Sequence, residues 1–288
     1  MSQYHRLMRL TFLAALAAAA LLAAGCGSEA EDAGVVSTAS GVEHVHGLGV
    51  DPADESLVIA THSGLFRAAD GEQEAERIGN RRQDTMGFTV VGPGRYLGSG
   101  HPDLRDDLPP LLGLIRSDDG GRSWDSVALL GEADFHILRS AGRFVYGVNS
   151  LDGALLVSGD AGRNWRKEAP PGPLVDLVPH PADPRHLIAA AEDGVHASED
   201  GGARWRPRAK GPTGLLAWPS AKELYVLDGS GVLRRSGDEG RSFEAVGSID
   251  GQPAAFAAHE GDLYVALHSN EIRVSDDGGR TWRTRVAA

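Results

Sequence analysis

One short segment recurs through this chain at a nearly constant interval. Each copy has a serine, an aspartate two residues later, a glycine two residues after that, and an aromatic residue at the end. The serines stand at positions 117, 158, 198, 236 and 275, so successive copies lie 41, 40, 38 and 39 residues apart. Periods near 40 residues are typical of folds built from one small repeated unit. The repeat therefore constrains the fold of most of the chain.

Five units carry the complete motif. Its members are Ser117, Asp119, Gly121 and Trp124; Ser158, Asp160, Gly162 and Trp165; Ser198, Asp200, Gly202 and Trp205; Ser236, Asp238, Gly240 and Phe243; and Ser275, Asp277, Gly279 and Trp282. A sixth, eroded copy has Ala68 and Asp70 in place of the serine and aspartate, 49 residues before Ser117. The insertion at residues 101–113 accounts for the wider spacing.

Each unit also contains four short segments with the character of β-strands. In the third unit these are residues 135–141, 143–149, 153–158 and 164–169, which are apolar or alternating and are separated by Gly, Asp and Asn. No segment after the first 25 residues sustains a helical period. The sequence therefore predicts an all-β chain, with residues 43–288 forming a six-bladed β-propeller of four-stranded antiparallel blades.

The motif has a physical reason to be repeated. The aspartate can accept backbone N–H groups across a tight turn, the glycine can adopt a conformation closed to other residues, and the aromatic ring can pack between blades. The motif resembles the Asp-box of BNR-repeat propellers, which include sialidases, sortilin-type ectodomains and photosystem II assembly factors. The segments "HVHGLGVDP", "DTMGF" and "DFHIL" further resemble exported bacterial proteins called glycosylhydrolase-like. The resemblance implies a fold with structural Asp-box turns and assigns no reaction.

The N-terminal 25 residues have the character of a secretory signal. Arg6 and Arg9 precede a fifteen-residue apolar run, which is shorter than the roughly 20 residues that a spanning helix needs. The segment "LLAAGC" is similar to a bacterial lipobox and ends at Cys26, the only cysteine of the chain. We therefore expect lipidation of Cys26, a flexible tether over residues 26–42, and an extracytoplasmic propeller anchored to a bacterial membrane through its N-terminal lipid.

Charge and cysteine content limit the partners. The chain carries a net charge of −12, and loss of Arg6 and Arg9 with the signal would leave −14. Such an acidic protein is not expected to bind nucleic acid or the anionic surface of a membrane. Without a second cysteine there is no disulfide framework. We expect a monomer whose partner is an envelope protein or a glycan.

The strand order predicts which residues share the rim opposite the Asp-box turns. First strands begin and second strands end at this rim, where six of the eleven histidines are expected. The residues predicted there with metal-ligand chemistry are His44, His46, His62, Met86, His101 and His136. The other polar residues predicted there are Asp84, Asp134, Asp176, Glu192, Asp228 and His268. The insertion over residues 102–110 is expected to lie over the same channel mouth as a lid.

Three interpretations of this rim remain open. In the first, the histidines of a polar channel mouth bond only water and backbone. In the second, the imidazoles bind copper or zinc, and the thioether of Met86 would favour copper, particularly Cu(I). Alternation along one strand is expected to place His44 and His46 on the same face, as ligands would require.

The third interpretation is a glycoside hydrolase. It requires two carboxylates on either side of a sugar, for which Asp84, Asp134, Asp176, Glu192 and Asp228 are candidates. A standard sialidase would also need an arginine trio and a tyrosine nucleophile, and no arginine is predicted among the rim residues. The sequence thus favours a binding or scaffold module and leaves enzymatic activity undecided.

Overall fold

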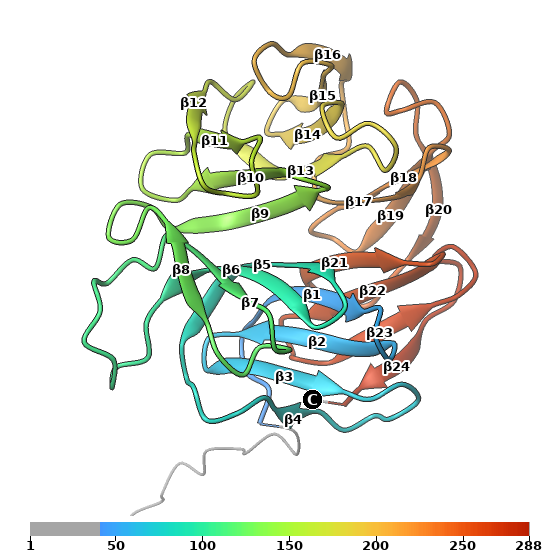
Figure 1. Ribbon diagram of the computed structural model, residues 1–288. Helices are drawn as coiled ribbons and strands as arrows, with labels where there is room; N and C mark the ends of the chain where they lie inside the picture. The colour runs from blue at the N-terminus through green and yellow to red at the C-terminus, as the bar shows by residue number, and fades with distance from the viewer. Residues whose placement is uncertain (1–40, 288) are drawn as a thin grey trace, which may run out of the picture. The chain divides into compact units, whose positions relative to one another are not determined.

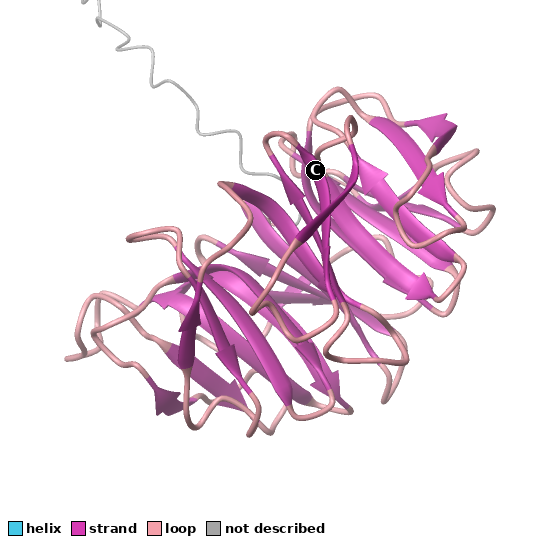
Figure 2. Cartoon of the chain, turned by 90° about the horizontal axis from the view of Figure 1, so that it is seen from above, coloured by secondary structure: helices cyan, strands magenta, loops and turns pink. Residues whose placement is uncertain are grey.

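The computed structural model describes residues 41–287, all of whose regular elements are strands (Figures 1 and 2). The predicted signal peptide, Cys26 and all but the last two residues of the tether lie outside the described residues. Within residues 41–287, no helix has the length and apolarity required to cross a membrane. The strands form six four-stranded antiparallel sheets, which confirms the predicted six-bladed β-propeller.

Each blade is a meander of four strands that are consecutive in the chain. The first three blades contain β1 (Val45–Asp51), β2 (Ser56–Thr61), β3 (Gly64–Ala68), β4 (Glu76–Arg77); β5 (Asp84–Gly92), β6 (Arg95–His101), β7 (Leu114–Ser117), β8 (Asp125–Ala128); and β9 (Phe135–Ala141), β10 (Phe144–Asn149), β11 (Leu155–Ser158), β12 (Arg166–Glu168). The last three contain β13 (Leu174–Pro179), β14 (Leu187–Ala191), β15 (Gly194–Ser198), β16 (Arg206–Ala209); β17 (Leu215–Ser220), β18 (Glu223–Leu227), β19 (Val232–Ser236), β20 (Glu244–Ser248); and β21 (Pro253–His259), β22 (Asp262–Leu267), β23 (Ile272–Ser275), β24 (Arg283–Val286).

The first strand of each blade lies at the centre of the ring. Strands β1, β5, β9, β13, β17 and β21 each contact the first strands of both neighbouring blades, and β1 meets β21 to complete the circle. The fourth strands lie at the periphery (Figure 1). The apolar core is divided among the spaces between adjacent blades; one such cluster joins Val58 and Leu65 of blade one to Phe88 and Tyr96 of blade two. This packing fixes the inner strands that carry the candidate site.

The repeated motif forms the same turn in five blades, between the third and fourth strands. In blade three, Ser158 Oγ donates to Asp160 Oδ1 (2.9 Å) and accepts the N–H of Gly162 (2.9 Å), while Asp160 Oδ1 accepts the N–H of Asn164 (2.9 Å). The other four turns repeat these three bonds. Gly162 has φ of 86°, and a Cβ atom there would lie 2.1 Å from Leu114. Both the conformation and the space therefore require glycine.

The aromatic residue that ends each motif packs between two blades. Trp165, for example, borders the core shared by blades two and three, lies 5.2 Å from the ring of Phe135 and donates its indole N–H to Gly162 O at 2.8 Å. The equivalent residues Trp124, Trp205, Phe243 and Trp282 border the cores of four other adjacent blade pairs, all except the pair of blades six and one. All five side chains are only partly buried. The rings thus cover the edges of the inter-blade cores.

Within residues 41–287, blades one and six each keep their own four strands, and the ring is closed by side chains and by the bond from Ala287 N to Gln73 O. An apolar cluster joins Val45 and Leu48 to Ile272 and Val286. The buried guanidinium of Arg285 donates to three carbonyl oxygens of blade one, those of Ala68, Ala69 and Glu72. Three charge-assisted bonds on one buried cation tie the last strand to the first blade.

Candidate functional site

The rim opposite the repeated turns brings two groups of histidines and aspartates together. First strands begin and second strands end there, as the pairing of Val45 with Thr61 shows for blade one. Each group is centred on one aspartate: Asp84 is the first residue of β5 in blade two, and Asp134 directly precedes β9 in blade three. The predicted pool of six metal-binding residues is therefore divided, and four of its members contact an aspartate.

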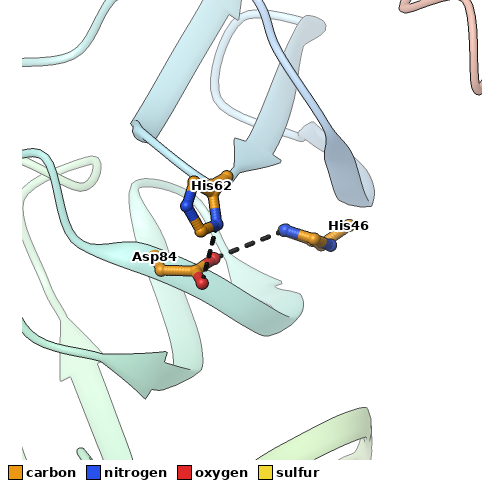
Figure 3. A group of neighbouring side chains, drawn as sticks. All are labelled: His46, His62 and Asp84. Atoms are coloured by element: carbon orange, nitrogen blue, oxygen red, sulfur yellow. Dashed lines mark ion pairs between the residues drawn. The ribbon is translucent and has the colours of Figure 1, made fainter. Parts of the chain in front are cut away.

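In the first group, two histidines of blade one converge on Asp84 of blade two (Figure 3). His62 Nδ1 lies 2.9 Å from Asp84 Oδ2, and His46 Nε2 lies 3.4 Å from Asp84 Oδ1. One ligand atom from each residue falls within 4.8 Å of the other two. The side chains of His46 and Asp84 are 23% and 14% exposed, and that of His62 is 66% exposed. The group is thus anchored in the rim and open on one side.

Two atoms of this group lack hydrogen-bond partners although they are buried. They are His46 Nε2 and Asp84 Oδ1, the two atoms that face each other at 3.4 Å. A buried polar atom without a partner is costly and calls for a bound ion or water. Two ligands bonded at 2.0–2.1 Å to a tetrahedral ion would lie about 3.4 Å apart. The separation therefore suits two ligands of one metal ion.

In the second group, two histidines face Asp134. His136 Nε2 lies 2.9 Å from Asp134 Oδ2, and His101 Nε2 lies 3.8 Å from the same oxygen. The hydroxyl of Ser150 donates to Asp134 Oδ2 at 2.7 Å, and the N–H of Asp134 donates to the side-chain oxygen of Asn149. Burial raises the pKa of Asp134, but the bonds from His136 and Ser150 outweigh it and leave the pKa below its usual value. The hydrogen bond to Asp134 raises the pKa of His136 against the opposing effect of burial.

The position of His44 corrects the prediction from alternation. β1 begins at Val45, and His44 precedes it with a left-handed φ of 48°. A register shift between Val45 and Gly47 then makes a bulge at His46. Bulges re-aim side chains, so simple alternation does not relate His44 to His46. The His44 ring lies 6.2 Å from that of His62 but does not belong to the three-residue group.

Met86 occupies the bulge of the next blade, between Thr85 and Gly87, and is partly buried. Two other rim residues predicted from the sequence stay outside both groups. Glu192 and His268 follow the second strands of blades four and six and are exposed. Glu192 and His268 match the predicted rim without joining a cluster of histidine and carboxylate ligand atoms among residues 41–287.

Asp176 and Asp228 are held by cations and by backbone. Asp176 is 1% exposed, accepts two bonds from Arg139 (2.8 and 2.9 Å), and accepts the N–H of Leu216 at 2.9 Å. It therefore links blades three, four and five at the channel. Asp228 caps its own turn and pairs with Arg234, and these bonds lower its pKa against the effect of burial.

Sequence reasoning missed Arg139, which lies at the centre of the channel. It lines both a cavity of about 200 Å³ at the histidine rim and one of about 530 Å³ towards the repeated turns. Leu48, Phe88 and Phe256 also line both cavities, so these four residues separate them. The signal was an arginine directly after the apolar pair Ile137 and Leu138 in the predicted first strand of blade three. His46 and His136 line the smaller cavity, which therefore connects the two histidine groups to the channel.

The insertion between β6 and β7 does not line either channel cavity, in contrast to the predicted lid. Its Asp103 accepts the N–H of Arg82, and Arg105 donates to Asn80 O, both in the link between blades one and two. Its other end is bonded to the link between blades two and three, where Gly131 N donates to Leu111 O. The insertion thus braces two links. Its Pro110 O accepts the N–H of His101 Nδ1 at 2.8 Å, which ties the insertion to the rim.

Comparisons with known proteins identify the fold. No protein-family model and no curated protein matches the chain. The solved structure of YCF48 from Cyanidioschyzon merolae is similar with a TM-score of 0.51 and 18% identity, covering 84% of each chain. YCF48 bound to D1 peptide gives a TM-score of 0.51 and 15% identity, covering 84% of this chain and 82% of that one. An ancestral GH74 enzyme gives a TM-score of 0.57 and 12% identity, but this chain spans only 38% of it. At these identities the similarity establishes a propeller fold alone.

Proposed function

We propose that this propeller is a metal-dependent binding module whose working surface is the histidine rim. A divalent ion of the zinc or copper type is held by His46, His62 and Asp84. The observation that carries the proposal is the pair of buried, unpartnered atoms His46 Nε2 and Asp84 Oδ1, which face each other at a ligand-to-ligand separation of 3.4 Å. Two imidazoles and one carboxylate are the ligands that such ions use.

A site with three protein ligands keeps at least one coordination position for an incoming group. Because His46 lines the cavity at the rim, that position would be accessible to a ligand entering the channel. The ion would supply a Lewis acid for an oxygen or nitrogen atom of the ligand. The similarity to a propeller solved with a bound peptide supports a binding role. The partner would be a protein segment of the cell envelope, because the N-terminal sequence predicts export.

The glycoside hydrolase alternative finds less support in the same rim. Four of the five candidate carboxylates already have partners: Asp84 and Asp134 contact histidines, while Asp176 and Asp228 pair with arginines. A glycosidase needs one carboxylic acid and one free carboxylate on either side of the sugar. The fifth candidate, Glu192, is exposed and contributes no ligand atom to the groups described above.

The proposal includes the location expected from the N-terminal sequence. The protein is exported and retained on a bacterial membrane by lipid on Cys26, so the rim works outside the cytoplasm. Mass spectrometry of the mature N-terminus should find a diacylglyceryl-modified Cys26. A mature protein cleaved elsewhere, or a Cys26→Ser variant still retained on the membrane, would overturn this part.

Metal titration of the purified protein tests the central proposal. Zinc or copper should bind to the purified protein. His46→Ala and Asp84→Asn should each weaken the affinity of the site formed by His46, His62 and Asp84 at least tenfold, since each removes one of three ligands. His268→Ala is the matched control, because this exposed histidine lies on the same rim outside both groups. Affinity should fall as the pH drops through about 6.5, since neutral imidazole is the ligand. Unchanged binding by His46→Ala would contradict the proposal.

A further inference from the structure

We propose that the histidine rim faces the membrane and that an apolar patch on this rim inserts into the lipid interface. The patch is formed by Leu104, Leu108, Leu130, Leu151 and Val175. Its occupant is the surface of a lipid bilayer. The inference rests on the proposed location, in which lipid on Cys26 retains the protein on a membrane. It adds the orientation of the propeller, which a lipid anchor alone does not determine.

The first argument is the distribution of exposed apolar side chains. Among residues 41–287, the large apolar side chains that are exposed are the five of the patch, with Leu104 fully exposed. All five lie in links between blades, in turns between second and third strands, or at the start of a first strand, and each of these places is at the histidine rim. They are Leu104 and Leu108 in the insertion between β6 and β7, Leu130 in the link between β8 and β9, Leu151 in the turn between β10 and β11, and Val175 in β13. Single exposed apolar residues are ordinary, but their concentration on one rim marks an interaction surface.

The elements that carry the patch are neighbours from blade two to blade four. The link between β8 and β9 donates the N–H of Gly131 to Leu111 O of the insertion at 2.8 Å. The turn between β10 and β11 donates the N–H of Ser150 to Asp134 O, at the end of that link, at 2.8 Å. Val175 and residues of β9 line the same cavity at the rim. The five side chains therefore follow one arc of the rim.

The second argument is the charge of the insertion that carries two of the leucines. Of its three aspartates, Asp103 pairs with Arg105, and Asp106 pairs with Arg81 at 2.6 Å. A paired charge costs less to bring near the apolar part of a bilayer than a single charge does. Because the whole chain is acidic, attraction to anionic lipid does not drive the contact. The contact depends on the apolar side chains, as in other proteins that lie in the interface.

The third argument is the place where the chain enters the propeller. His44 donates its N–H to the side-chain oxygen of Asn270 at 2.9 Å, and Asn270 lies in the turn between β22 and β23, at the histidine rim. Fifteen positions separate Cys26 from Gly41, the first described residue. A segment of this length spans at most about 50 Å. A lipid on Cys26 therefore favours the orientation in which this rim, and not the rim of the repeated turns, faces the membrane.

This orientation restricts the partner of the proposed metal site. Val175 of the patch and His46 of the metal site line the same cavity at the rim. A ligand that enters this cavity would therefore approach from the side of the membrane. We expect the ligand to be a segment of a membrane-embedded protein close to the lipid surface, rather than of a freely diffusing envelope protein.

Fluorescence of the lipidated full-length protein on vesicles tests the orientation. Cys26 is the only cysteine, and its sulfur carries the lipid, so an introduced cysteine is the one free thiol. An environment-sensitive dye is attached to Leu104→Cys and, as the matched control, to Asp118→Cys in the exposed part of the repeated turn of the same blade. The vesicles contain phosphatidylcholine and phosphatidylethanolamine, with or without a nitroxide-labelled lipid. The nitroxide should lower the fluorescence at Leu104→Cys about twofold and leave that at Asp118→Cys nearly unchanged.

The outcomes separate this inference from the proposed location. Equal quenching at Leu104→Cys and Asp118→Cys, or none at Leu104→Cys, would overturn the orientation while the lipid anchor stands. Uptake of the dye by the protein without an introduced cysteine would show that Cys26 carries no lipid. That result would refute the proposed location and, with it, the orientation.

A second set of variants tests whether the leucines themselves make the contact. The dye is placed at Leu151→Cys, on the neighbouring blade, in chains with and without the pair Leu104→Ser and Leu108→Ser. Both leucines are exposed, and thermal melting verifies that the serine variant is folded. Quenching at Leu151→Cys should disappear in the serine variant, and quenching that persists would refute the role of the patch. Fluorescence that changes with protein concentration and not with lipid would assign the patch to contact between copies of the chain and contradict the inference.

Discussion

The serine of the repeated turn offers the sharpest test of how this fold is stabilised. Ser158 is 0% exposed, and its hydroxyl accepts the buried N–H of Gly162 at 2.9 Å while it donates to Asp160 Oδ1. Replacing Ser158 by alanine removes this acceptor from a fully buried position. The N–H of Gly162 would then remain buried and unpaired.

The size of the effect follows from these bonds. A buried donor left without a partner costs about 1–3 kcal/mol, and the lost bond from the hydroxyl to Asp160 adds about 0.5–1.5 kcal/mol. Removal of the buried hydroxyl offsets part of this. We expect Ser158→Ala to lower the free energy of unfolding by about 2–3 kcal/mol, or about 4–9 °C in Tm for a domain of this size.

Urea unfolding followed by tryptophan fluorescence measures the loss. Ser123→Ala is the matched control, because Ser123 bonds Asp119 at an exposed position of the equivalent turn in blade two. That change should cost no more than about 0.5 kcal/mol. Equal effects of the two substitutions, or a loss below about 0.5 kcal/mol for Ser158→Ala with an unchanged m-value, would refute the reasoning.

Three further predictions concern the turns and the ring. Trp165→Ala should cost about 2–3 kcal/mol in urea unfolding, less than the 3–5 kcal/mol of a fully buried aromatic residue, because the ring is partly exposed; a loss near 5 kcal/mol would show that it is buried in solution. Hydrogen bonds from the Asn164 side chain and backbone lower the pKa of Asp160 to about 2. The stabilising contribution of Asp160 is therefore complete when the pH is above about 3.9, the pKa of this carboxyl in the unfolded chain, and it disappears as the pH falls towards 2. Between pH 5 and 2.5, Asp160→Asn should lose less stability than the unmodified protein. Identical stability profiles in acid would contradict this. Arg285→Met should lower the free energy of unfolding by about 2–3 kcal/mol, because it leaves carbonyl groups of blade one unpaired. Arg283→Met, at an exposed position of the same strand, should leave that free energy nearly unchanged.

The repeat was sufficient to predict the fold because the residues of each copy define one turn by themselves. A buried serine, a glycine with positive φ and an aromatic ring at fixed spacing define one turn, and five such turns at a 40-residue period leave room for four strands each. The expected segment at residues 135–141 coincides with β9. The side-chain packing that closes the ring, with Arg285 at its centre, has no periodic signal because it occurs once.

The candidate site was less accessible to sequence reasoning for a local reason. The bulges at His46, Met86 and His136 interrupt the alternation on which the face of each residue was predicted. The same reasoning grouped the histidines in one pool, whereas Asp84 and Asp134 divide them into two groups. Contacts across blades, such as His62 with Asp84 or Arg139 with Asp176, depend on the curvature of the ring and leave no motif in the chain.

The central claim is that His46, His62 and Asp84 bind one metal ion through the atoms that face each other. Crystals of the protein grown with zinc, and measured above and below the zinc absorption edge, test this most directly. We predict an anomalous peak about 2.0–2.2 Å from His46 Nε2, His62 Nδ1 and Asp84 Oδ1. A zinc-containing crystal with no peak at Asp84, or with the ion held elsewhere while His46 and Asp84 stay in contact, would contradict the account.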